Sequence, residues 1–517
     1  MFDKTYFIIY IILSVILSFA FGLNGLWYFI FSVFVGLIVL AYKPEEASSF
    51  ALPKYLLIIP LVIFLLSRLL PFILYGPHPL GYDTGFYKYN ITQERNHNLG
   101  QLSLAIAEST GSRIITESLI NLGFSDQVIL YGFYIFVGAF IGLFIYLLAR
   151  KYFNETAAFF SLLVYSISFV QYLAFWDMFW KNAVGLCLSL LVFILIEKNK
   201  LVYYLLTLPL IFAVVITHKT SAFLLILGLI LYFALSKNIK TAYKFFAFVF
   251  LFVLTFVFLL INKEIFLYLW QQINSGFKVY YDFFSVKEGL FIDTNQFFGI
   301  SYVFFYLPFA LLTILSLFKK RQINPILVYF AICALIVLTK FIFYKRVIVY
   351  LDVTLLIFFG YSFSIFVNKI RLATSKYYAL IFIIILLTLP TLLFFVNVIN
   401  QKPLISKEEI KYIEELKTFS PSLRLLTYNS YYTPWLYGFS GHKIIAPGWG
   451  DDRWDLKKWQ IFWGANMSLK KEMLIDFKPP FLIYDNGDGF FKFGEENCFS
   501  KIRKNLYLFN CQLSVTH

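Results

Sequence analysis

The sequence GPHPLGYDTGFYKYNITQERNHNLG, residues 76–100, follows an apolar run at 55–75 and precedes further apolar runs. An apolar run of roughly 20 residues is long enough for a helix to cross a lipid bilayer. The quoted stretch brings an aspartate, several tyrosines and a series of polar residues to the end of that helix. It therefore predicts a polar loop at a membrane surface, with Asp83 near its start.

The composition of the whole chain is that of an integral membrane protein. Apolar types make up 60% of the 517 residues and charged types 14%, whereas soluble domains have about 45–50% and about 25%. The first apolar run follows Lys4 and has no small-residue cleavage site, so we expect a retained span rather than a signal peptide. The net charge of +15 would also suit nucleic acid, but the positions of the charges favour membrane orientation.

The apolar runs predict a polytopic α-helical membrane protein with about thirteen transmembrane helices. Helices are expected because lipid offers no partner for unpaired backbone groups. The expected spans are 6–21, 26–42, 55–75, 127–149, 155–174, 181–196, 201–216, 221–236, 245–262, 299–318, 325–343, 347–367 and 377–398.

The distribution of Lys and Arg predicts that the N-terminus is cytoplasmic. With that orientation, sixteen Lys and Arg residues lie in short inside segments, and only Lys181, Lys219, Lys345 and Arg346 lie in short outside segments. Such an excess sets orientation. Two long loops, about 76–126 and 263–298, and the C-terminus then lie outside. No internal repeat is visible.

After residue 400 the chain changes from a transmembrane domain, 1–400, to an extracytoplasmic α/β domain, 401–517. A capping box, Ser406 to Glu409, opens an expected helix, and LRLLTYN, HKIIAP and FLIYD are typical of short strands. Cys498 and Cys511 could form a disulfide outside the cell, and the sequence alone leaves that pairing open.

Asp83 can be a helix N-cap, a functional carboxylate, or both. It is suited to be the N-cap of a helix beginning at TGFYKYN, and a capped turn would hold its carboxylate rigidly at the membrane surface. The rest of the loop, to about residue 126, has apolar residues at helical spacing but is too polar to span. We therefore expect two juxtamembrane helices there.

Further charged residues occur at other expected outer span ends. Asp177 lies in FWDMFWKN, where a carboxylate beside lipid needs a partner such as Lys181 or a function. His218 in THKTSA would serve either as a local hydrogen-bonding group or as a substrate ligand. Lys345 and Arg346 either extend to the surface or bind a phosphate, and Asp352 could neutralise Arg346.

Carboxylates and cations on one side of the membrane are suited to the transfer of a lipid-linked phosphosugar. A carboxylate would accept the proton of the acceptor hydroxyl, and the cations would stabilise the departing phosphate. The motifs GYDTGFY, WD followed by Asn182, THKTSA and an arginine before a span resemble the GT-C superfamily of polyprenyl-phosphate-dependent glycosyltransferases. This superfamily includes protein O-mannosyltransferases, aminoarabinose transferases and oligosaccharyl transferase catalytic subunits.

The resemblance implies roles for individual residues. Asp83 would be the catalytic base or a metal ligand, Asp177 a second acidic site residue, and Arg346, with Lys345, the phosphate-binding group. His218, Tyr87, Tyr281 and Asp282 would contact substrate, the last two from a mobile loop that also contains Tyr280. There is no DxD pair, so a divalent metal such as Mg²⁺ or Mn²⁺ stays open. WWDYG is absent, which argues against transfer of a whole glycan to asparagine.

The expected function is an inverting, multi-pass glycosyltransferase of the cell envelope that acts on the outer face of the cell membrane. Its partners would be a polyprenyl-phosphate sugar donor and a lipid, glycan or protein acceptor, with no nucleic acid. Two alternatives are a multi-spanning transporter or flippase and a polysaccharide polymerase or ligase handling lipid-linked glycans. The sugar, carrier, acceptor and oligomeric state are not determined by the sequence.

Overall fold

The computed structural model describes most of the chain as two compact units, which we treat separately. The described residues are 4–20, 25–41, 53–96, 110–198, 200–236, 292, 296–297, 301–341, 344–373, 376–429, 431–447, 449–450, 454–485 and 498–511. Unit 1 combines Met1–Gly76 with Phe133–Gln401, and unit 2 combines Pro77–Gly132 with Lys402–His517. The C-terminal segment therefore shares its unit with the first long loop.

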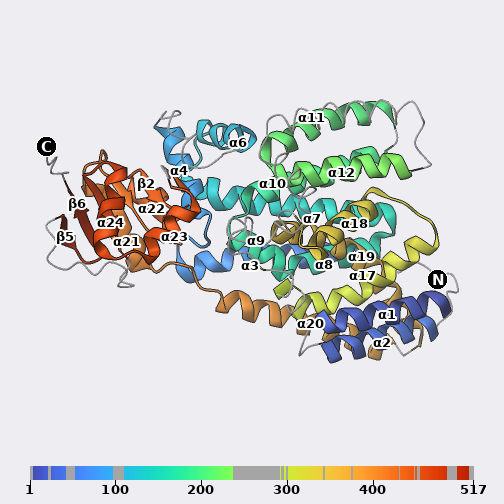
Figure 1. Cartoon of the computed structure of the whole chain (residues 1–517). Coiled ribbons are helices and arrows are strands. Elements are labelled where there is room, and N and C mark those ends of the chain that lie inside the picture. Colours follow the sequence, from blue (N-terminus) through green and yellow to red (C-terminus); the bar gives the residue numbers. More distant parts are fainter. Residues whose placement is uncertain are drawn as a thin grey trace. The chain divides into compact units, whose positions relative to one another are not determined.

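Unit 1 is a bundle of apolar helices (Figure 1). After a short 3₁₀ turn, η2 (Lys54–Leu57), its third helix begins at Ile58. The helices of the bundle are α1 (Lys4–Ala20), α2 (Gly25–Ala41), α3 (Ile58–Tyr75), α7 (Phe133–Tyr152), α8 (Glu155–Ser166), α9 (Phe169–Trp176), α10 (Trp180–Ile196), α11 (Leu201–Thr217), α12 (Lys219–Leu235), α17 (Ser301–Lys319), α18 (Pro325–Leu338), α19 (Tyr344–Ala373) and α20 (Lys376–Asn400).

Among the described residues, four helical segments are long and apolar enough to cross a membrane, or five if one bent pair forms a single span. Shorter apolar helices account for seven more of the expected spans. The structure thus supports a mostly helical membrane protein, and the expected number of about thirteen spans stays a prediction. The expected span at 245–262 lies outside the described residues.

Helix α19 forms the centre of unit 1 and packs mainly against α8, α17 and α18. It approaches α8 so closely that a β-carbon at Gly360 would lie 2.2 Å from the carbonyl oxygen of Ala157. Small residues allow such close contact between membrane helices, where packing rather than burial from water favours association. The outer surfaces of α3 and α20, in contrast, expose apolar side chains, as expected for surfaces facing lipid.

The expected span at 155–174 comprises two helices, α8 and α9, with a bend of 46° between them. That the pair forms one span stays a prediction. Ser168 ends the first helix by acting as the N-cap of the second, where its hydroxyl accepts a hydrogen bond from the Gln171 amide at 3.2 Å. Arg68 of α3 donates to the carbonyl of Ser166 at the end of α8, at 3.2 Å. Asp352 of α19 accepts from the Ser168 hydroxyl at 2.8 Å. A cation at a helix C-terminus and a carboxylate at an N-terminus both stabilise the helix ends.

Unit 2 contains a six-stranded mixed sheet with helices packed on it (Figure 1). The strand order is β3-β2-β1-β4-β6-β5, with β1 parallel to β2 and β4 and the other pairs antiparallel. The strands are β1 (Arg424–Leu426), β2 (Ile444–Ala446), β3 (Trp449–Gly450), β4 (Phe481–Tyr484), β5 (Phe499–Arg503) and β6 (Leu506–Phe509). Its helices are α4 (Thr84–Arg95), α6 (Thr110–Asn121), α21 (Lys407–Glu415), α22 (Thr433–Ser440), α23 (Leu456–Gly464) and α24 (Met467–Leu474), with short turns η3 (Val128–Gly132), η4 (Leu416–Thr418) and η5 (Ile475–Phe477).

Alternate residues of each central strand contribute to two separate cores. Leu425 and Leu482 point into one core, with α21 and α22, whereas Leu426 and Ile483 point into the other, with α23 and α24. This alternation follows from the two-residue period of a strand. Phe86 of α4 belongs to the first core, so the first loop supplies part of the interior of this α/β unit.

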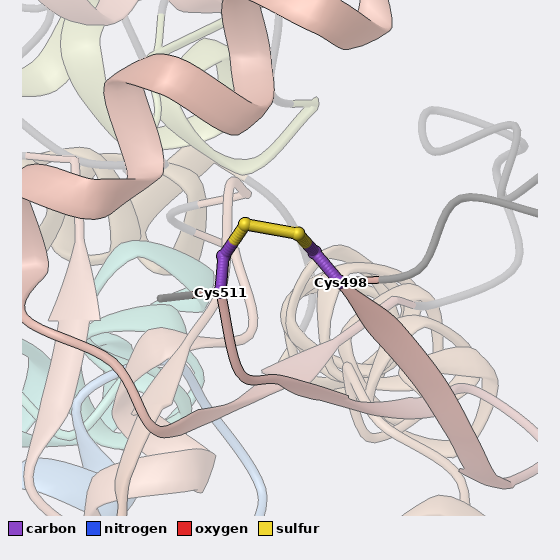
Figure 2. The surroundings of a disulfide bond; sticks show 2 residues. All are labelled: Cys498 and Cys511. Atoms are coloured by element: carbon purple, nitrogen blue, oxygen red, sulfur yellow. A yellow bond between two sulfur atoms is a disulfide. The ribbon is translucent and has the colours of Figure 1, made fainter. Parts of the chain in front are cut away.

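A disulfide joins Cys498, directly before β5, to Cys511, which follows β6 (Figure 2). It ties the start of the edge strand β5 to the end of its neighbour β6. Disulfides persist in oxidising compartments and are rare in the cytosol. The extracytoplasmic position of unit 2 stays a prediction, with which this bond agrees.

Candidate functional site

His218 lies at the junction of α11 and α12 in unit 1 and is buried in a network of hydroxyl groups. Its Nδ1 accepts a hydrogen bond from the Ser221 amide at 3.3 Å and lies 2.8 Å from the Ser221 hydroxyl. The Tyr350 hydroxyl lies 2.5 Å from the Ser221 hydroxyl and 3.3 Å from the histidine Nδ1. The expected local hydrogen bond of His218 is therefore confirmed. Because Nδ1 accepts the backbone hydrogen bond, Nε2 carries the proton.

Two cations are close enough to His218 for their charges to affect its pKa. Burial, followed by the positive charges of Arg346 and Lys181, lowers the pKa of His218 well below its ordinary value, so the ring is neutral at pH 7. Lys181 comes from the start of α10 and Arg346 from the start of α19, and both are half-buried. The ends of α10, α11, α12 and α19 thus gather a neutral N–H donor and two cations, which is a suitable environment for an anion. Lys345 precedes Arg346 at the same helix end and is also half-buried.

Asp177 follows α9, in the turn that leads to Lys181. Its amide donates to the carbonyl of Leu173 at 2.8 Å and ends the helix, and its side chain is half-buried. The carboxylate thus lies in the short turn between α9 and α10, and Lys181 lies in the first turn of α10. A charged group so close to apolar helices is most often functional or paired.

The expectation that Asp352 neutralises Arg346 is wrong. Asp352 is fully buried, accepts hydrogen bonds from Ser168 at 2.8 Å and Gln171 at 2.9 Å, and is also bonded to the Tyr306 hydroxyl. Its carboxylate therefore fixes the start of α9, whose far end bears Asp177. The sequence contained a signal for this break, because Ser168 and Gln171 have the spacing of a capping box inside an apolar run.

Arg68 is not among the residues predicted from the sequence. The signal was present, because a charged residue inside an apolar run indicates a special role. Arg68 is 2% exposed and its guanidinium donates to the Ser67 hydroxyl at 2.8 Å as well as to Ser166. The ring centre of Phe64 lies 4.6 Å from the guanidinium carbon, at a distance typical of a cation–π contact.

In unit 2, Asp83 occupies the N-cap position of α4, as expected, but its side chain makes no capping hydrogen bond. Its carboxylate is half-buried, whereas Tyr87, one turn further on, is buried. The helix itself is held by Asp126, which pairs with Lys88 and, at 2.8 Å, with Arg95. Asp83 and Tyr87 belong to unit 2 and Arg346 to unit 1, so their expected proximity stays a prediction.

No protein-family model and no curated protein matches the sequence. Several solved structures are similar in fold. The apo oligosaccharyltransferase of Archaeoglobus fulgidus is 11% identical, with a TM-score of 0.61 over 85% of this chain and 70% of that chain. The same enzyme, AglB, with an inhibitory peptide and a dolichol-phosphate is 13% identical, with a TM-score of 0.58 over 83% and 69%. ArnT from Cupriavidus metallidurans bound to undecaprenyl phosphate is 11% identical, with a TM-score of 0.53 over 88% and 98%.

The chain has a GT-C fold. At these identities the comparisons establish the fold alone. Tyr280, Tyr281 and Asp282, which the resemblance assigned to a mobile GT-C loop, lie outside the described residues.

A third structure of the A. fulgidus GT-C enzyme, 13% identical with a TM-score of 0.56, holds Zn and sulfate. Among the described residues of this chain, no group of three or more His, Cys, Asp or Glu side chains could hold a metal ion. Asp83 and Asp177 belong to different units. We therefore assign no metal-ligand set.

Proposed function

We propose that the chain is a membrane glycosyltransferase that moves a sugar from a polyprenyl-phosphate-linked donor to an acceptor on the outer face of the membrane. The observation that carries this proposal is the gathering of His218, Lys181 and Arg346 at one end of the GT-C helical bundle. Two cations and a neutral N–H donor suit a phosphate group more than any uncharged ligand. The apolar surfaces of neighbouring helices suit the prenyl chain.

In the proposed reaction, an acceptor hydroxyl attacks the anomeric carbon of the donor sugar. The new bond to the acceptor oxygen forms as the bond to the phosphate oxygen breaks, and its electron pair stays on the phosphate. Asp83 takes the hydroxyl proton, and the anomeric centre is inverted. Arg346, Lys345 and Lys181 stabilise the phosphate as its negative charge increases.

Asp177 has a second role in this proposal. Its half-buried carboxylate at the end of α9 would orient the acceptor or the donor sugar by accepting hydrogen bonds from hydroxyl groups. Tyr87, Tyr281 and Asp282 would complete the contacts to substrate. The disulfide of unit 2 supports an outer location for this unit, where it would bind the acceptor.

Binding of polyprenyl phosphate itself tests the phosphate site. The full-length chain in nanodiscs should bind it, and Arg346→Ala or Lys181→Ala should weaken binding by about tenfold or more, since hydrogen bonds to charged groups are lost. Lys219→Ala is a matched control, because Lys219 adjoins His218 but is exposed. Equal binding of polyprenyl phosphate by the wild type and the three variants would contradict the proposed phosphate site.

The alternatives predict different products. A flippase would move the intact lipid-linked sugar across a proteoliposome membrane without cleaving the sugar–phosphate bond. A polymerase or ligase would yield repeating or whole glycans on the acceptor. Formation of a singly glycosylated acceptor together with free polyprenyl phosphate would support the proposal, and intact donor on the opposite leaflet would overturn it.

A further inference from the structure

A small cavity of about 20 Å³ lies inside unit 1, where α3, α7, α8, α9, α10 and α19 meet. Most of its walls are apolar, but Arg68, Gln171 and Asn182 also line it. A cavity needs about 10–15 Å³ by the same kind of measure to hold one water molecule. The space is therefore large enough for a small ion or a water molecule.

Arg68 gives this cavity a positive charge, because a guanidinium stays protonated in proteins. Among the described residues, no carboxylate lies within ion-pair distance of it; its partners are the Ser67 hydroxyl, the Ser166 carbonyl and two aromatic rings. The C-terminal end of α8 supplies about half a negative charge, which offsets only part of the cation. A buried charge without full compensation is costly.

Asn182 adds a second unmatched donor to the same cavity. Its side chain is 5% exposed, and its Nδ2 has no hydrogen-bond acceptor. The Gln171 amide nitrogen, in contrast, is already used by the carbonyl of Val349 and by Asp352, both at 2.9 Å. The cavity therefore combines a cation with an N–H group that lacks a partner, and a negative ligand would satisfy both.

We propose that this cavity binds a small monovalent anion of halide size. A water molecule could accept from Asn182, but it would leave the charge of Arg68 uncompensated. Sulfate or phosphate would bring a second negative charge, and Arg68 is the one cation among the described residues that line the cavity, which separates this site from the phosphate site at Arg346. The proposal does not depend on the proposed sugar transfer.

Equilibrium binding of radioactive chloride to the full-length chain, in detergent and at constant ionic strength made up with gluconate, tests the site. Wild-type protein should bind chloride saturably, and bromide should compete whereas sulfate should not. Arg68→Gln should lower chloride affinity by about tenfold or more, and Asn182→Leu should lower it severalfold, by about threefold to tenfold. Arg346→Ala should leave it unchanged.

Absence of saturable chloride binding by the wild type would overturn the proposal, as would unchanged affinity in both cavity variants. If Arg68→Gln fails to fold, the chloride affinity of Asn182→Leu alone tests the site, because this variant removes the amide donor and keeps the charge of Arg68. Loss of chloride binding in Arg346→Ala would also overturn it, because the anion would then lie at the other site.

Discussion

The backbone of Gly85 in α4 lies so close to α22 that a β-carbon at Gly85 would be 1.9 Å from the carbonyl oxygen of Pro434. The contact is reciprocal, because a β-carbon at Gly438 would be 2.3 Å from the carbonyl oxygen of Gly85. Two glycines, about 350 residues apart in the sequence, thus allow two helix backbones to touch. The helix that follows Asp83 is thereby part of the α/β unit.

Gly85→Ala should destabilise unit 2 by about 3 kcal/mol or more, because a backbone oxygen cannot move aside as a flexible side chain can. The rate of limited proteolysis of unit 2 within the full-length chain would measure the effect. Gly464→Ala is the matched control, since nothing lies within 4 Å of a β-carbon there. Equal protease resistance of the two variants would contradict the described contact.

Asp352→Asn should destabilise unit 1 by about 2–3 kcal/mol. Ser168, Gln171 and Tyr306 donate hydrogen bonds to this carboxylate, and the asparagine side chain would replace one of its acceptor oxygens by an NH₂ donor. Thermal unfolding of the purified chain would report the change. Ser364→Ala on the same helix should cost less, as that hydroxyl bonds only to the Tyr361 carbonyl one turn away. A smaller effect of Asp352→Asn than of Ser364→Ala would refute the assigned network.

The contribution of Asp126 to the stability of unit 2 should be lost at acid pH. Burial opposes ionisation, but Lys88 and Arg95 outweigh it and hold the pKa of Asp126 below its ordinary value. The carboxylate therefore contributes stability above the ordinary aspartate pKa, and this contribution is lost as the pH falls through the lowered value. Asp126→Asn should cost about 1 kcal/mol at pH 7 and less at a pH below the ordinary aspartate pKa. A cost of Asp126→Asn that is the same at both pH values would argue against the ion pairs.

The disulfide determines which cysteines can react with an alkylating reagent before reduction. Denatured, unreduced protein should be alkylated only at Cys187 and Cys333, the free cysteines, and reduction should expose the other two. Because Cys498 and Cys511 have a sequence separation of 13, loss of the bond in Cys511→Ser should cost unit 2 about 3 kcal/mol. Alkylation of four cysteines before reduction would rule the bond out.

Local features of the fold were predictable from the sequence. Ser406 and Glu409 form the expected capping box, and the central strands β1, β2 and β4 lie within the predicted segments. Apolar runs identified the helices of unit 1 because lipid and core packing both select continuous apolar surface. The local hydrogen bonds of His218 followed from its position at a helix junction.

Long-range features were not predictable. The packing of Phe86 into the C-terminal core depends on contacts between distant segments, and no local pattern encodes them. The bend at Ser168 depends equally on Asp352 and Arg68 from other helices. The convergence of Lys181 with His218 and Arg346 was anticipated only as a common side of the membrane, because sidedness follows from charge counting whereas distance requires packing.

Sugar transfer by the purified full-length chain in proteoliposomes tests the central claim most directly. The probe is a set of radiolabelled polyprenyl-phosphate sugars, offered with a membrane extract as the acceptor source. The account predicts labelled acceptor and released polyprenyl phosphate with the wild type. It predicts loss of both with Asp83→Asn, although that variant should fold and bind polyprenyl phosphate normally. Transfer by Asp83→Asn at the wild-type rate would contradict the account.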